Sequence, residues 1–172
     1  MDSRTIIIGN IVGLVGSALM VVIGLIKTKK KILIVQIVQT AVFALSNFIL
    51  GGVSGVIVNA VTVIRNVFVL KKPFTLPAKL FFIAAQVVLA FLFRSEGIIY
   101  WLPVMAGCIF TYFLDSENDM VIKIAIAFAQ AMWAVYDFSI MNFTTFAFDV
   151  FAIISNIVGI VLLNKERHTD ST

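Results

Sequence analysis

Amide side chains recur at matched spacings in two long apolar stretches of the chain. Gln39 is followed 27 positions later by Asn66, and Gln130 is followed 26 positions later by Asn156. An amide offers both hydrogen-bond donors and an acceptor, so these four side chains suit binding of a neutral polar solute. The repeated order predicts two similarly built halves with a polar pocket between them.

A second polar position precedes each asparagine by seven residues: Asn59 precedes Asn66, and Asp149 precedes Asn156. Seven residues are about two turns of an α-helix, so each pair shares one helix face. Trp133, three positions after the second glutamine, lies close to the same face and is suited to stacking on a solute. These positions predict a substrate pocket. As the alternative, the amides stabilise contacts between helices, worth about 0.6 kcal/mol each on average.

Arg65 and Asp149 are the charged residues deepest in the apolar stretches, where ionisable groups are usually functional or paired. The sequence leaves three roles open for Arg65: reaching to the lipid headgroups, pairing with Asp149, or contacting an anionic group of a solute. Asp149 is a candidate proton-titrating site, a hydrogen-bond acceptor for a solute, or a structural partner. Asp137 is expected at the membrane interface, in contact with water.

The composition determines the environment of these groups. Of the 172 residues, 61% are hydrophobic and only 13% are charged, against roughly 25% charged in soluble domains. The mean hydropathy is +1.08. The apolar stretches have helical length, about 17–25 residues, and lack the alternation of barrel strands. We therefore expect an all-α integral membrane protein with a single membrane domain, residues 1–172.

Seven transmembrane helices are predicted, separated by lysines, glycines, prolines and an acidic segment. Pro73 and Pro77 are expected to lie outside the helices. The predicted helices are 5–26, 32–50, 53–70, 78–93, 98–114, 120–138 and 143–163.

Basic residues gather at alternate ends of these helices. One side of the membrane receives Lys27, Lys29, Lys30, Lys31, Lys71, Lys72, Lys79, Lys165 and Arg167. The other side receives Arg4 and Arg94, each offset by a nearby acidic residue. The positive-inside rule then predicts that this multi-pass protein has its N-terminus outside and its C-terminus in the cytoplasm.

The charge pattern and the helix count predict two parallel three-helix repeats joined by a linker helix, a 3+1+3 arrangement. The first repeat covers about 5–70, the linker about 78–93 and the second repeat about 98–163, followed by a short cytoplasmic tail, 164–172. At an offset of 91, Gly16 also meets Gly107. The small residues Gly9, Gly13 and Ser17 fit packing within the bundle or, as the alternative, a homo-oligomer contact.

Three helices, a linker and three more, with an asparagine on the third and seventh helices, resemble the SWEET-like superfamily of small transporters. Within it, the compact length and the lysine-rich first loop are similar to the YgjV-type bacterial inner-membrane proteins. In SWEET-type sugar facilitators those asparagines face the solute, so the resemblance implies that role for Asn66 and Asn156. Trp133 would take the place of a solute-stacking tryptophan, whereas Val42 stands at the matching position of the first half.

The sequence thus predicts a transporter or facilitator for a small polar solute, working by alternating access around a midplane pocket. The alternative is a non-transporting membrane scaffold or accessory subunit. The only histidine, His168, lies in the tail, and no nucleophile–base pair stands inside the apolar stretches. No enzyme activity, cofactor, metal site or nucleic-acid partner is therefore expected; the expected partners are the lipid bilayer and the solute.

Overall fold

Seven α-helices make up almost all of the part of the chain that the computed structural model describes, residues 1–26, 28–93, 97–114, 116 and 119–169. In chain order they are α1 (Ser3–Leu25), α2 (Lys29–Ile49), α3 (Val53–Lys71), α4 (Leu76–Leu92), α5 (Ile98–Phe113), α6 (Asp119–Ser139) and α7 (Phe143–Thr169). The prediction of an all-helical chain with seven helices is confirmed for these residues.

Every helix end except the last lies within three residues of the predicted one, and two of the differences have a clear physical reason. Helix α4 begins at Leu76, so Pro77 lies in its first turn, where the missing N–H of proline costs no hydrogen bond. The prediction that Pro77 lies outside the helix is wrong for that reason. Helix α7 continues to Thr169, so much of the predicted tail is helical. No glycine or proline follows position 163 to end the helix.

Five helices are long and apolar enough to cross a membrane. They are Ser3–Ile23, Lys30–Ile49, Val53–Lys71, Met120–Ser139 and Phe143–Val161. Helices α4 and α5 are equally apolar but shorter, with 17 and 16 residues. At about 1.5 Å per residue they extend roughly 25 Å, somewhat less than the hydrocarbon core of about 30 Å.

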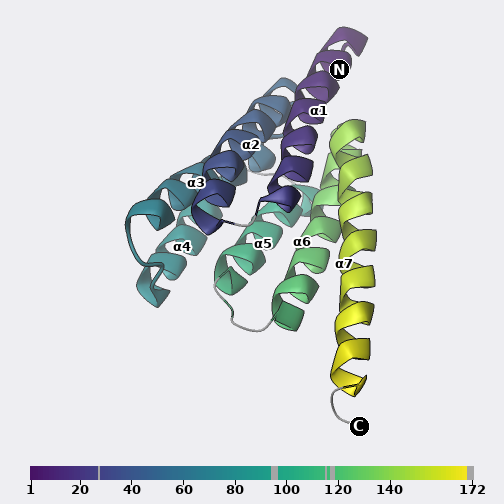
Figure 1. Ribbon diagram of the computed structural model, residues 1–172. Coiled ribbons are helices and arrows are strands. Elements are labelled where there is room, and N and C mark those ends of the chain that lie inside the picture. The colour runs from purple at the N-terminus through teal and green to yellow at the C-terminus, as the bar shows by residue number, and fades with distance from the viewer. Residues whose placement is uncertain (27, 94–96, 115, 117–118, 170–172) are drawn as a thin grey trace.

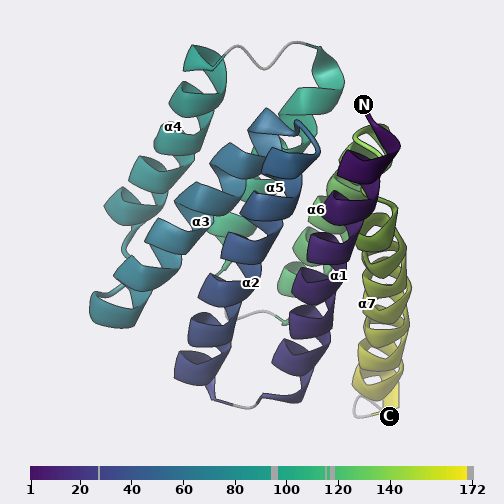
Figure 2. The same cartoon turned by 90° about the horizontal axis from the view of Figure 1, so that it is seen from above.

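Six of the helices form a closed ring. Helix α1 packs against α2 and α7, α3 packs against α2 and α5, and α6 packs against α5 and α7. Helix α4 lies outside this ring, against α3 and α5, at the periphery of the bundle (Figures 1 and 2). Exchanging α1 with α5, α2 with α6 and α3 with α7 leaves the ring contacts unchanged.

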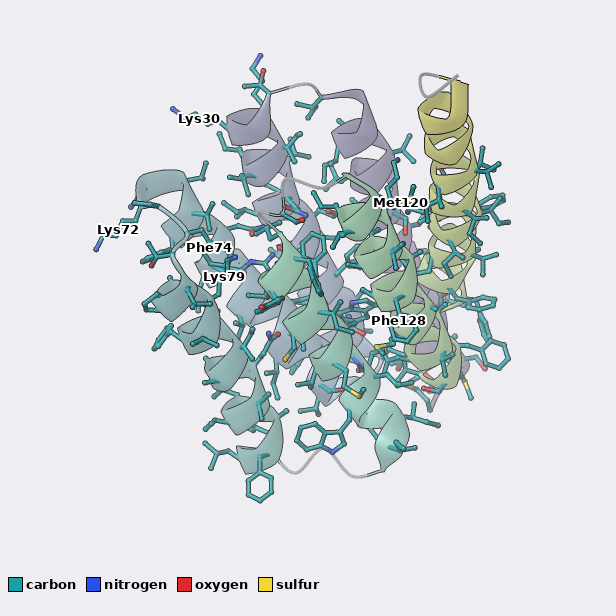
Figure 3. The ribbon with its side chains drawn as sticks, turned by 90° about the horizontal axis from the view of Figure 1, so that it is seen from below. Lys30, Lys72, Phe74, Lys79, Met120 and Phe128 are labelled. Atoms are coloured by element: carbon teal, nitrogen blue, oxygen red, sulfur yellow. The ribbon has the colours of Figure 1, made fainter. Side chains whose placement is uncertain are left out.

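The chain termini lie at opposite ends of the bundle (Figure 2). Lys30, Lys72 and Lys79 lie toward the end where α6 begins, as Figure 3 shows, and we call this the lysine end. Lys27 and Arg94 are outside the described residues, as are the side chains of Lys29, Lys165 and Arg167.

The small residues of α1 pack within the bundle. A Cβ atom added at Gly9 would lie 2.5 Å from the Leu50 side chain, and one at Gly13 would lie 2.8 Å from Oδ1 of Asn142. Ser17 is fully buried. These close approaches allow α1 to pack tightly against both α2 and the start of α7.

The bundle is apolar outside and polar inside. Phe48, Phe91 and Ile98 expose 73%, 73% and 82% of their surface, whereas Arg65 and Asp137 each expose 1%. A water-soluble domain shows the opposite distribution. The exterior is therefore suited to hydrocarbon, and the polar groups are kept away from it.

Tyr136 closes the bundle at the end opposite the lysines. Its fully buried ring crosses from α6 to α3, where its hydroxyl accepts a hydrogen bond of 3.0 Å from the backbone N–H of Gly55. That N–H lies in the first turn of α3 and has no partner within the helix. Leu50 and Ile140 pack against the ring. We call Leu50, Tyr136 and Ile140 the tyrosine plug.

Removing the hydroxyl of Tyr136 tests whether it caps the start of α3. We expect Tyr136→Phe to lower the free energy of unfolding by about 1–3 kcal/mol, because the buried N–H of Gly55 loses its acceptor. Thermal unfolding in detergent measures the effect, with the exposed Tyr112→Phe as the matched control. Equal melting temperatures for the two variants would contradict the capping role of Tyr136.

Candidate functional site

A cavity of about 370 Å³ lies inside the ring, within the size range of small-molecule sites. All six ring helices contribute to its lining, and α4 contributes no lining residue. Its polar lining residues are Gln36, Gln39, Thr40, Asn47, Asn59, Thr62, Arg65, Gln130, Asp137, Thr145 and Asp149.

The cavity extends along the bundle axis. Near the tyrosine plug its lining includes Asp137, the residue after Tyr136, and Asn47. Toward the lysine end it reaches Ile23 and Gln36, which lie near the end of α1 and the start of α2. The plug therefore separates the cavity from the end of the bundle opposite the lysines.

Six of the eight predicted site residues line this cavity. The glutamines Gln39 and Gln130 face it from α2 and α6, and Asn59 and Asp149 face it from α3 and α7. Trp133 lines it too, with its ring edge-on to Tyr136 at a centroid distance of 5.8 Å. Arg65 is the sixth. The residues that occupy matching positions in the two halves, Gln39 with Gln130 and Asn59 with Asp149, therefore line the same cavity.

Asn66 and Asn156 are not part of the lining. Asn66 is fully buried, and its Nδ2 donates to Oε1 of Gln36 at 3.3 Å. Asn156 is half-buried and donates to the backbone oxygen of Ala152 at 2.8 Å, within its own helix. The structure therefore does not place these two asparagines in one site. Each amide donates to a protein oxygen, and neither residue lines the cavity.

Arg65 is held by neutral groups alone. Its Nη1 donates to Oγ1 of Thr111 at 2.8 Å, and its Nε and Nη2 donate to Oδ1 of Asn66 at 3.3 and 3.1 Å. Its Cζ lies 5.4 Å from the ring centroid of Phe110. Arg65 is buried, so it does not reach out to the lipid headgroups. It also forms no ion pair with Asp149 in the described structure, so neither of these two roles applies to it.

Asp137 and Asp149 form a buried carboxyl pair. They expose 1% and 4% of their surface, and the two side chains lie within hydrogen-bonding reach of one another. Asn142 donates to Oδ1 of Asp137 at 3.3 Å, whereas Oδ2 of each carboxyl has no donor. The expectation that Asp137 contacts water at the interface is wrong, because the turn into α7 encloses it.

A family model described as Imp-YgjV, bacterial inner membrane protein, matches residues 7–167. The chain belongs to this family. No curated protein and no solved structure matches it. The YgjV-type resemblance is confirmed, and it identifies the apolar exterior as a surface that contacts the lipid of a bacterial inner membrane.

Sequence reasoning missed several polar groups of this YgjV-family site, among them Gln36, Thr111 and Asn142. Gln36 stands three positions before Gln39, so helical spacing was a usable signal for it. Thr111 carries no such signal, because threonine in a membrane helix commonly bonds to its own backbone. Asn142 follows Met141, whose φ is +63°, and an asparagine there is first interpreted as a turn residue.

Within the described residues, no group of three or more histidine, cysteine or acidic side chains is arranged to hold a metal ion. The side chains that line the YgjV-family cavity offer hydrogen bonds and charge. Amides line its middle, a guanidinium lies on α3 and two carboxyls lie beside the plug.

Substitution of one carboxyl tests the pair. We expect Asp149→Asn to melt at a temperature no lower than the wild type at neutral pH, because its uncharged amide donates to the open oxygen of Asp137. Asp149→Ala supplies no donor to that oxygen and should be less stable than Asp149→Asn by about 1–3 kcal/mol. The exposed Asp2→Asn is the control in thermal unfolding. Equal losses in the Asn and Ala variants would show that the two carboxyls do not interact.

Proposed function

We propose that this protein is a transporter or facilitator that moves a small polar solute through the central cavity by alternating access. The observation that carries the proposal is a cavity inside a ring of helices whose exterior is apolar, with amide, hydroxyl and charged side chains among the apolar ones of its lining. Polar groups at membrane depth are tolerated where they are satisfied by protein or line a water-filled space. A bundle that only had to be stable would gain more by filling this volume with apolar side chains.

The ring supports a 3+1+3 arrangement of two parallel repeats. Its contacts are unchanged when the first three helices are exchanged with the last three, and Gln39 and Gln130 line the cavity from matching helices. Helix α4 is outside the ring, as a linker between repeats would be. Two halves of this kind are able to rock about the site between them. This is also the plan of the SWEET-like superfamily.

The orientation follows from the lysines. The positive-inside rule assigns the lysine end to the cytoplasm, and we therefore assign the N-terminus and the tyrosine plug to the outer side. We also propose that α4 and α5 cross the membrane with the five longer helices. The conformation described is then closed to the outside by Tyr136. Opening there requires Leu50 and Ile140 to separate from its ring.

The lining determines what the site accepts. Gln39, Gln130 and Asn59 offer donors and acceptors to a polar solute, and Trp133 offers a ring face. Asp149, against Asp137, is the group best placed to couple transport to a proton. The alternative function, a scaffold or accessory subunit, requires that no solute enters the cavity.

Filling the cavity tests the transport route. Ala129 lines it and is 5% exposed, whereas Ala131 on the same helix faces outward. We expect Ala129→Phe to reduce solute uptake into proteoliposomes by about tenfold or more, because its ring occupies space that the solute needs and a barrier higher by about 1.4 kcal/mol slows a step tenfold. Ala131→Phe should leave uptake unchanged.

The solutes for this assay are those of a small polar panel that raise the melting temperature of the wild type. Unreduced uptake by Ala129→Phe would exclude the cavity as the route. No uptake and no stabilisation by any solute would support the scaffold.

A further inference from the structure

We infer that the solute carries an anionic oxygen group, a carboxylate or a phosphate, which binds the guanidinium of Arg65 inside the cavity. This inference rests on the proposed function and names the class of its substrate. It depends on the charge, the free donors and the position of this one side chain.

The charge of Arg65 is not neutralised by any neighbour. The side chain is 1% exposed, its acceptors on Asn66 and Thr111 are neutral, and no carboxylate among the described residues lies within ion-pair distance of it. An isolated buried charge costs several kcal/mol even after the surroundings relax. Arginines near a helix end usually avoid this cost by reaching to the headgroups, which Arg65 does not do.

The guanidinium retains free donors. Of its five N–H groups, three donate to Asn66 and Thr111, which leaves one on Nη1 and one on Nη2. These two nitrogens form the planar fork that matches two oxygens of a carboxylate or phosphate. Arg65 is one of the residues that line the cavity, so the fork lies beside the space that a solute would occupy.

The surroundings orient the fork and leave room for a ligand. The ring of Phe110 lies 5.4 Å from Cζ and supports the guanidinium, as arginine–aromatic pairs commonly do. Thr62, one turn before Arg65 on α3, and Gln36 line the same cavity and add neutral donors. The carboxyl pair lies on α6 and α7 and makes no ion pair with Arg65 in the described structure, so it does not occupy the fork.

The first experiment compares matched solutes on the purified protein in a neutral detergent. Lactate is paired with lactamide, and glycerol phosphate with glycerol, at constant ionic strength in chloride. We expect an anion to raise the melting temperature by about 5–10 °C at roughly 100 times its Kd, and its neutral partner to have no such effect. The two pairs distinguish carboxylate from phosphate. Adding phosphatidylglycerol in mixed micelles and measuring the melting temperature tests whether the bound anion is a lipid headgroup or a soluble solute.

The second experiment supplies the missing counter-charge from the protein. Thr111→Asp places a carboxylate where the buried hydroxyl accepts from Nη1. It should raise the melting temperature without solute and abolish the anion-dependent rise. Thr111→Asn has the same shape without the charge and should keep the rise. Lys72→Gln removes an exposed positive charge at the lysine end and should also keep it.

The outcomes separate this inference from the proposed function. An anion-dependent rise that only Thr111→Asp abolishes supports the inference. Equal responses to lactate and lactamide, no response to any anion, or a rise that persists in Thr111→Asp would overturn it. Uptake of neutral solutes alone would overturn the anion site but retain the transporter. Anion binding without uptake of any solute would retain the site and overturn the transporter.

Discussion

Hydrocarbon offers no hydrogen bonds, and this constraint determines where the polar side chains of the bundle lie. Six helices close into a ring with phenylalanines and aliphatic side chains outside, and the amides, hydroxyls and charges turn inward. Once inside, each polar group either bonds to the protein or lines a common space. Tyr136 illustrates the first solution, since its hydroxyl accepts from a buried backbone N–H in the first turn of α3 that has no partner within the helix. Gln39 and Gln130 illustrate the second.

The two kinds of charge in this interior are treated differently. The carboxyls of Asp137 and Asp149 lie together and receive a donor from Asn142. Arg65 is supported by neutral oxygens and an aromatic ring, without an opposite charge. A protein that needed only stability would be better served by an apolar side chain there. Arrangements that lower stability and have no structural role are expected at functional sites. Arg65 and the two carboxyls line the same cavity.

Much of the fold was predictable because hydropathy and the glycine and proline breaks determine where membrane helices begin and end. Helical spacing also predicted the faces that bring Asn59 and Asp149 to one cavity. Spacing does not predict local partners, however. Asn66 faces inward as expected, but the adjacent Arg65 takes its oxygen. The burial of Asp137 depends on a tertiary contact across the turn into α7, which no periodicity records.

The most direct measurement is the water accessibility of the cavity, which needs no knowledge of the solute. With Cys108→Ser as background, Ala129→Cys places a thiol in the lining and Ala131→Cys places one on the outward face of the same helix. A small water-soluble methanethiosulfonate reacts with thiolate, which forms in water and not in hydrocarbon. The account predicts rapid labelling at 129 and little at 131. Labelling at 131 without labelling at 129 would show that the centre of the bundle is dry, and would contradict it.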